Sequence, residues 1–234
     1  AEELKAGVKT KPYFYNKITV LFGDIKGFTR ITEEMGRGML IEKLSRCFLQ
    51  FDHIVEKYNI EKIKTVGDAY MAAGGIPHEN QTHPVEIILA GMEMQNYMHR
   101  VSNGSGHKMW DIRIGVDTGP VVAGVIGRNK LSYDIWGSTV NMASRMEALS
   151  EAGKINITGN THALIKDFFI CRYRGKMPVK NSGQIDMYFV EGLRPAFAND
   201  SQGLAPNRHF HTNMQLLRLN DLEEVVLEKL EGLP

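Results

Sequence analysis

Two short strands joined at a glycine are predicted by residues 61–71, which read EKIKTVGDAYM. Strand-forming residues surround Gly67, and a glycine at this point permits a sharp turn. Asp68 comes directly after the turn, where burial of an unpaired carboxylate would cost several kcal/mol. A cation, either a lysine or a metal ion, would offset that cost. A solvated aspartate in a surface turn is the alternative.

The composition is that of an ordinary globular protein. The chain has 234 residues, enough for one large or two small domains, and 43% are hydrophobic while 24% are charged. The formal net charge of +1 indicates neither nucleic acid nor an anionic membrane as a partner. Any anion site must therefore be a local feature.

The cysteines and the apolar runs predict a cytoplasmic location. Cys47 and Cys171 have no CxxC spacing, and reduced thiols are the expected state. No apolar run reaches the roughly 18 residues that span a bilayer, and no signal peptide opens the chain, so we expect no direct membrane contact. The start at Ala1 suggests a piece of a longer protein, whose parent could be membrane-anchored.

A second junction of strand and glycine lies near the N-terminus. The apolar strand 17–22 runs into the segment 23–29, which reads GDIKGFT before a helical pattern. Free backbone N–H groups at a helix start can bind phosphate oxygens, and Asp24 can hold a cation beside them. The alternative is that Asp24 or Thr29 only caps the helix.

The remaining pattern alternates between helices and strands. Apolar residues at helical spacing predict core-packed helices over 40–58, with Ile41 on the apolar stripe, and over 84–101. A polar loop is expected at 78–83, where two histidines are more typical of solvated residues than of a metal site. Residues 194–213 have no period and are expected to form a linker before a final amphipathic helix.

Three further side chains point to an anionic ligand. Arg113 lies among apolar residues in a strand and should have an anionic partner. Asn141 and Arg145 are four residues apart on a predicted helix and so share one face. An amide and a guanidinium projecting together suit a sugar–phosphate ligand, and an ordinary surface pair is the alternative.

The order of these motifs resembles the class III adenylate/guanylate cyclase catalytic domain, of the homodimeric adenylate cyclase type. The resemblance covers about residues 14–193 and is carried by the segments 22–29, 64–70, 113–115 and 133–145. It implies an α/β fold, an α+β sandwich with a ferredoxin-like βαββαβ core extended by C-terminal strands and a terminal helix. We therefore expect an N-terminal linker at 1–13, the catalytic domain at 14–193, and a linker and helix at 194–234 that could begin another module.

The resemblance implies a metal-dependent site. Asp24 and Asp68, with the backbone carbonyl of Ile25, match the ligands of two divalent ions, and oxygen ligands suit Mg or Mn. Triphosphate binding is implied for Arg113 and Lys180 and for the backbone of three residues, Gly27, Phe28 and Thr29. Many relatives have a second glycine and a second lysine around Lys180, whereas this chain reads KNSG at 180–183.

The purine and ribose residues are also implied by the resemblance. Lys64 and Asp134, with Ile135 beside the latter, match the positions that select the purine. Lysine can donate to adenine N1 and aspartate can accept from the 6-amino group, whereas guanylate-forming relatives typically carry Glu and Cys there. Asn141 matches the residue that orients the ribose, and Arg145 matches the one that stabilises charge at the α-phosphate.

These expectations add up to an adenylate cyclase that converts ATP into 3′,5′-cyclic AMP and pyrophosphate. One chain carries the whole set, which predicts a head-to-tail homodimer with two composite sites. Each site takes Asp24 and Asp68 from one chain and the following residues from the other: Lys64, Asp134, Asn141, Arg145 and Lys180. The alternatives are a guanylate cyclase and an inactive cyclase-like module that only dimerises or binds nucleotide.

Overall fold

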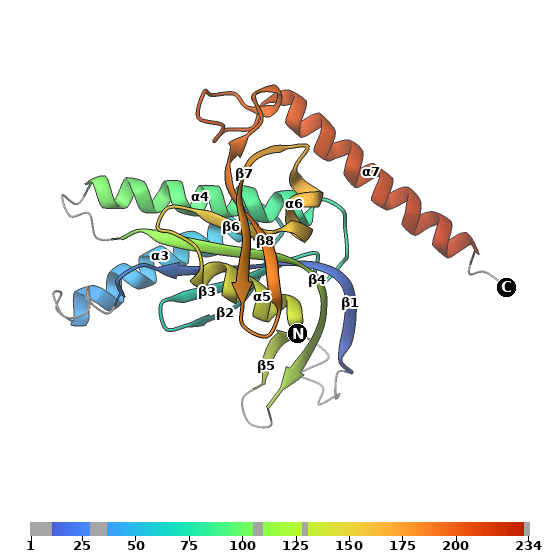
Figure 1. Cartoon of the computed structure of the whole chain (residues 1–234). Helices are drawn as coiled ribbons and strands as arrows, with labels where there is room; N and C mark the ends of the chain where they lie inside the picture. The colour runs from blue at the N-terminus through green and yellow to red at the C-terminus, as the bar shows by residue number, and fades with distance from the viewer. Residues whose placement is uncertain (1–10, 29–36, 105–109, 128–130, 232–234) are drawn as a thin grey trace.

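The elements follow one another as helices and strands of a mixed α/β domain (Figure 1). The computed structural model describes residues 11–28, 37–104, 110–127 and 131–231. Within these ranges the elements are β1 (Tyr13–Ile25), α3 (Arg37–Lys57), β2 (Glu61–Val66), β3 (Ala69–Gly74), α4 (His83–Gly104), β4 (Ile112–Ile126), β5 (Ser132–Trp136), α5 (Ser138–Ala148), β6 (Ile155–Thr158), α6 (Gly159–Ile165), β7 (Phe169–Val179), β8 (Gly183–Leu193), the 3-10 turn η1 (Pro195–Phe197) and α7 (Arg208–Glu231).

The sheet confirms the predicted ferredoxin-like core. In the described residues eight strands form one sheet in the order β2-β3-β1-β4-β6-β8-β7, with β5 paired to β4. The first four strands pair antiparallel throughout, as the order β1-α3-β2-β3-α4-β4 of a βαββαβ unit requires. The parallel pairing of β4 with β6 adds the C-terminal strands to this core.

Helices cover both faces of the sheet. Leu21 and Ile25 of β1 belong to the cluster that α3 and α4 cover, whereas Val20 packs with Ala143 of α5 in a second cluster. Alternating residues of one strand therefore face two different layers, as the period of a β-strand dictates. This arrangement explains why residues 17–22 form a continuous apolar run.

Two details of the helical layer differ from the sequence expectation. Ile41 lies on the predicted apolar stripe but is 67% exposed, so the buried face of α3 excludes it. His83 is not part of a solvated loop. It is the first residue of α4 and is 1% exposed, and burial lowers its pKa to about 3, so the imidazole is neutral.

The C-terminal helix begins earlier than expected. Residues 208–213 were predicted to be linker, but α7 starts at Arg208, and Phe210 and Met214 are buried in the cluster under α3 and α4. The Arg218 side chain donates to the nearly buried Glu86 at 2.6 Å. Two apolar residues among histidines and asparagines give too weak a pattern to indicate this packing. Figure 1 shows α7 continuing away from the sheet.

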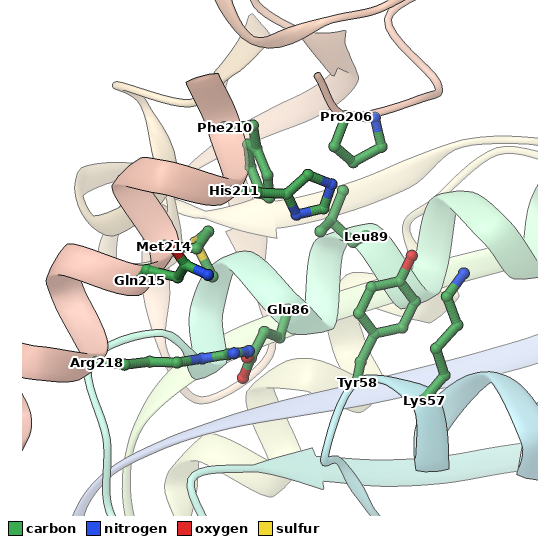
Figure 2. Close-up of a pocket in the computed structure, with 10 residues that line it drawn as sticks. All are labelled: Lys57, Tyr58, Glu86, Leu89, Pro206, Phe210, His211, Met214, Gln215 and Arg218. Carbon is green, nitrogen blue, oxygen red and sulfur yellow. The ribbon is translucent and has the colours of Figure 1, made fainter. Parts of the chain in front are cut away.

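A pocket of about 440 Å³ lies between α7, α4 and the end of α3 (Figure 2). The charged groups around it are already paired, because Lys57 contacts Glu93 at 2.7 Å and Arg218 contacts Glu86. The pocket is built by helices, whereas the candidate site residues lie on the strands, their connecting turns and α5.

Candidate active site

The two candidate metal carboxylates gather at one end of three adjacent strands. Asp24, near the end of β1, lies opposite Ala69 of β3 and Arg113 of β4. Asp68 precedes Ala69 in the turn after Gly67, whose φ of 62° lies in the left-handed region that glycine tolerates. The hairpin turn therefore places Asp68 beside the end of β1.

The electrostatics of this pair fit a cation. Burial, together with the charge of Asp24, raises the pKa of Asp68 above its ordinary value. Arg113 donates from Nη2 to Asp24 Oδ2 at 2.9 Å and is the arginine that offsets the two carboxylates. Among the described residues, no three His, Cys, Asp or Glu side chains form a ready metal cluster. Two carboxylates with one arginine nevertheless suit a divalent ion that also takes backbone, water and substrate oxygens.

The sequence predicted an anionic partner for Arg113, and the structure shows two, Asp24 and Glu147. Besides Asp24, Arg113 contacts Glu147 of α5, with 2.5 Å between Nε and Oε1. Burial and the charges of Asp24 and Asp68 outweigh the attraction of Arg113 and raise the pKa of Glu147 to about 7. Glu147 was not predicted as a site residue, because nothing in its local sequence separates it from a surface glutamate.

Close packing of α5 on β4 brings Glu147 to Arg113. A Cβ at Gly115 would lie 1.8 Å from the backbone nitrogen of Glu147, and one at Gly119 would lie 2.7 Å from Thr139 Oγ1. Only glycines at these two positions of β4 allow the helix to lie so near. Gly115 is two residues from Arg113 and so lies on the same face of the strand.

The candidate purine pair is assembled by β2 and β5. Lys64 donates to Asp134 with 2.5 Å between Nζ and Oδ2, and the Asp134 side chain is only 13% exposed. Asp134 Oδ1 accepts the backbone N–H of Ile135, whose own side chain is buried. Lys64 thus pairs with a residue 70 positions away rather than with Asp68. The hairpin at 61–71 therefore contributes Lys64 and Asp68 to two different groups of side chains.

The candidate ribose and phosphate residues lie on α5 and beside the β7–β8 turn. Arg145 donates from Nη1 to Ser182 Oγ at 2.7 Å, and Asn141 is exposed on the same helix. Lys180 is exposed in the turn, which is tightened by Asn181 and Gly183 at φ of 62° and 74°. Ser182 was not predicted as a site residue, although it lies in the same KNSG turn as Lys180.

The expected phosphate loop is described only in part. Gly27 adopts a φ of 74°, and Phe28 packs edge-on against Trp110 with ring centroids 6.5 Å apart. Thr29 lies outside the described residues. Ile25 buries its side chain in the core, so only its backbone is available as the expected ligand.

The candidate residues therefore form three groups. The first is Asp24, Asp68 and Arg113 with Glu147; the second is Lys64 and Asp134; the third is Asn141, Arg145 and Lys180 with Ser182. Among the described residues, no hydrogen bond or ion pair joins the first group to the second.

This fold and these residues define a nucleotide cyclase domain, and comparison with known families agrees. Residues 10–192 match the family described as the adenylate and guanylate cyclase catalytic domain. The chain belongs to this family, as the resemblance predicted.

Relatives of both nucleotide specificities are similar to this chain. An adenylate cyclase of Mycobacterium bovis is 35% identical over 182 residues, which is 78% of this chain and 41% of the relative. The adenylyl cyclase CyaB of P. aeruginosa superposes with a TM-score of 0.74 at 33% identity, covering 80% of this chain and 98% of that structure. The guanylate cyclase domain of RhGC from Catenaria anguillulae, solved with GTP, has a TM-score of 0.74 at 32% identity. The match covers 78% of this chain and 100% of that structure.

The chain spans less than half the length of the Mycobacterium relative. In the part of the chain that the structure describes, no helix is both long enough and apolar enough to cross a membrane.

Proposed function

We propose that this domain is an adenylate cyclase that converts ATP into 3′,5′-cyclic AMP and pyrophosphate at sites shared between two copies of the chain. The observation that carries the choice of ATP is the pair of Lys64 and Asp134. A lysine donor and a carboxylate acceptor held together complement adenine N1 and the 6-amino group.

The chemistry requires little covalent work from the protein. The ribose 3′-oxygen releases its proton to water and bonds to the α-phosphorus, and the bond from that phosphorus to the pyrophosphate oxygen breaks, so that pyrophosphate leaves with the electron pair. Two Mg or Mn ions would be held by Asp24, Asp68 and the carbonyl of Ile25, and they would lower the pKa of the 3′-OH and neutralise charge on the triphosphate.

The protein side chains orient the substrate and stabilise developing charge. Asn141 hydrogen-bonds the ribose and directs its 3′-OH at the α-phosphorus. Arg145 places its guanidinium on the oxygens whose charge grows in the transition state. Arg113, Lys180 and the backbone of 27–29 bind the triphosphate, and Ile135 lies beside the purine.

A head-to-tail homodimer completes each site in this proposal. Among the described residues no hydrogen bond or ion pair joins the carboxylate group of one chain to its purine pair, and in this proposal one nucleotide uses the carboxylates of one chain and the purine pair of the other. Large apolar side chains are exposed on β1, β4 and β5, among them Phe14 at 59%, Ile126 at 57% and Trp136 at 38%. Figure 1 shows the ends of these strands projecting together from the sheet. A second copy covering this surface would bury them.

The catalytic unit proposed here comprises residues 14–193, and a cytoplasmic location would supply its ATP. Both cysteines, Cys47 and Cys171, are free thiols, which is compatible with a reducing compartment.

The test is a cyclase assay with ATP or GTP, each with Mn or Mg, over a range of protein concentrations. We expect cyclic AMP from ATP, little cyclic GMP from GTP, and a specific activity that rises with concentration as dimers form. Preferred cyclic GMP formation would identify a guanylate cyclase instead. Nucleotide binding without any cyclic product would identify an inactive module.

A further inference from the structure

We infer that Glu147 is a positioning residue for Arg113, holding the guanidinium where it can leave the metal carboxylate and bind the triphosphate. This inference rests on the proposed function, since it assigns Arg113 to the triphosphate. It adds to the site a side chain that the motifs did not include.

The first observation is that Arg113 bridges two carboxylates through different nitrogens. Its Nη2 lies 2.9 Å from Asp24 Oδ2, and its Nε lies 2.5 Å from Glu147 Oε1. The Glu147 side chain is 12% exposed and that of Asp24 is 18% exposed, so both contacts are largely shielded from water. The Nε–Oε1 contact is an ion pair without hydrogen-bond geometry, whereas Nη2 donates a hydrogen bond to Asp24. Because the guanidinium is a rigid plane, two contacts on different nitrogens together restrict its orientation.

The second point is that a bound cation would affect the Arg113–Asp24 contact and the Arg113–Glu147 contact differently. Asp24 is a candidate metal ligand, so its contact with Arg113 must weaken when a divalent ion takes the carboxylate oxygens. Glu147 is one step removed from the metal pair and can keep its contact. Without Glu147, Asp24 would be the remaining carboxylate paired with Arg113, and the arginine would compete with the metal for it.

The third observation is that the backbone fixes Glu147 in place. A Cβ added to Gly115 would lie only 1.8 Å from the backbone nitrogen of Glu147, so α5 packs directly on β4 at this point. Gly115 shares a strand face with Arg113. This packing fixes the backbone of Glu147 beside the strand that carries Arg113, and the largely buried carboxylate meets the guanidinium there, which suits a positioning residue.

The test is a double-mutant cycle on nucleotide affinity, with Glu147→Gln and Arg113→Gln alone and together. The probes are Mn with α,β-methylene-ATP and with α,β-methylene-GTP, which cannot be cyclised, measured by calorimetry. We expect Glu147→Gln to weaken binding of both analogues about tenfold, the effect of one charge-assisted contact. In the Arg113→Gln background the same change should alter affinity less than about twofold.

Glu151→Gln is the matched control, because Glu151 follows α5 and its carboxylate lies 4.0 Å from Arg174 rather than against Arg113. It should leave the affinity for both analogues unchanged. Melting temperatures of all variants show whether each one folds. The Nε–H resonance of Arg113 gives a second readout, and Glu147→Gln should shift it and speed its exchange with solvent.

Three results would overturn the inference. If Glu147→Gln weakened nucleotide affinity equally with and without Arg113, Glu147 would contact the metal or the nucleotide directly. Unchanged affinity in folded Glu147→Gln protein would make the contact merely structural. An unaltered Arg113 resonance would show that Glu147 does not hold the guanidinium. Failure of the proposed function is distinguishable, since the protein would then form no cyclic AMP from ATP, whereas the effect of Glu147→Gln on the Arg113 resonance would still be measurable.

Discussion

At the scale of single residues, we assign nucleotide choice to Lys64 and Asp134. Lys64 and Asp134 are held together at 2.5 Å, so changing both should alter the preference for adenine. We predict that Lys64→Glu with Asp134→Cys lowers the ratio of kcat/KM for ATP to that for GTP about 100-fold. This ratio is about 2.7 kcal/mol, near the lower limit for two hydrogen bonds to charged groups at about 1.5 kcal/mol each. Initial rates with both nucleotides measure it.

Lys62→Glu is the control for this change, because Lys62 lies on the same strand but pairs with Asp52 at 2.7 Å. It should leave the ratio unchanged. An unaltered ratio in the double variant would refute the role assigned to Lys64 and Asp134.

A second residue-scale feature is the buried carboxyl of Asp117 on β4. It is 5% exposed and accepts from Thr158 Oγ1 at 2.6 Å, yet burial raises its pKa to about 6. In the folded protein the Asp117 carboxyl therefore keeps its proton over a pH range in which the same carboxyl of the unfolded chain, with a pKa near 3.8, releases it. The stabilisation is complete below about pH 4 and is lost as the pH rises through 6.

We predict that wild type loses about 2 to 3 kcal/mol of unfolding free energy relative to Asp117→Asn between pH 4 and pH 7. Urea unfolding of both proteins at several pH values measures the difference. Subtraction removes the contributions of other groups, such as His83. A difference that does not vary with pH would contradict the raised pKa.

At the scale of elements, the contact between α5 and β4 organises the carboxylate group. We predict that Gly115→Ala destabilises the fold by about 1–3 kcal/mol or more, because the added methyl group meets the backbone of α5. Chemical unfolding measures this cost. In any protein that remains folded, nucleotide affinity should fall as well, since the helix that carries Glu147 must move.

Gly124→Ala on the same strand is the matched control. A Cβ there would come no nearer than 3.5 Å to Trp136, which is an ordinary contact. It should cost less than about 0.5 kcal/mol. Similar losses in both variants would mean that the close approach at Gly115 has no special importance.

The strongly periodic elements could be predicted from the sequence, and the weakly periodic ones could not. The α3 stripe was found because Phe51, Ile54 and Val55 repeat at helical spacing and are buried. The start of α7 was missed because Phe210 and Met214 stand among polar residues, and their burial depends on surfaces that α4 supplies from far away in the sequence.

At the scale of the whole molecule, the fold and the family could be predicted because several spaced motifs occur together. The contacts within the site could be predicted only in part. Arg113 was expected to have an anionic partner, but Glu147 is 34 residues away and reaches it through tertiary packing. The contact between Ser182 and Arg145 likewise depends on how the β7–β8 turn meets α5.

The division of the site between two copies is the central claim at this scale. Asp24 and Asp68 lie with Arg113, whereas Lys64 lies with Asp134, and each nucleotide needs both groups. Substitutions in different groups should therefore complement one another in a mixed dimer, whereas substitutions in the same group should not.

The most direct measurement is cyclic AMP formation from Mn-ATP by an equal mixture of Asp68→Ala and Arg145→Ala chains, each inactive alone. Half of the dimers would be mixed, and each would have one intact site, so we predict about a quarter of the wild-type specific activity. A mixture of Asp68→Ala with Asp24→Ala is the control and should stay inactive. No recovery of activity in the first mixture, with dimers formed, would contradict the shared site.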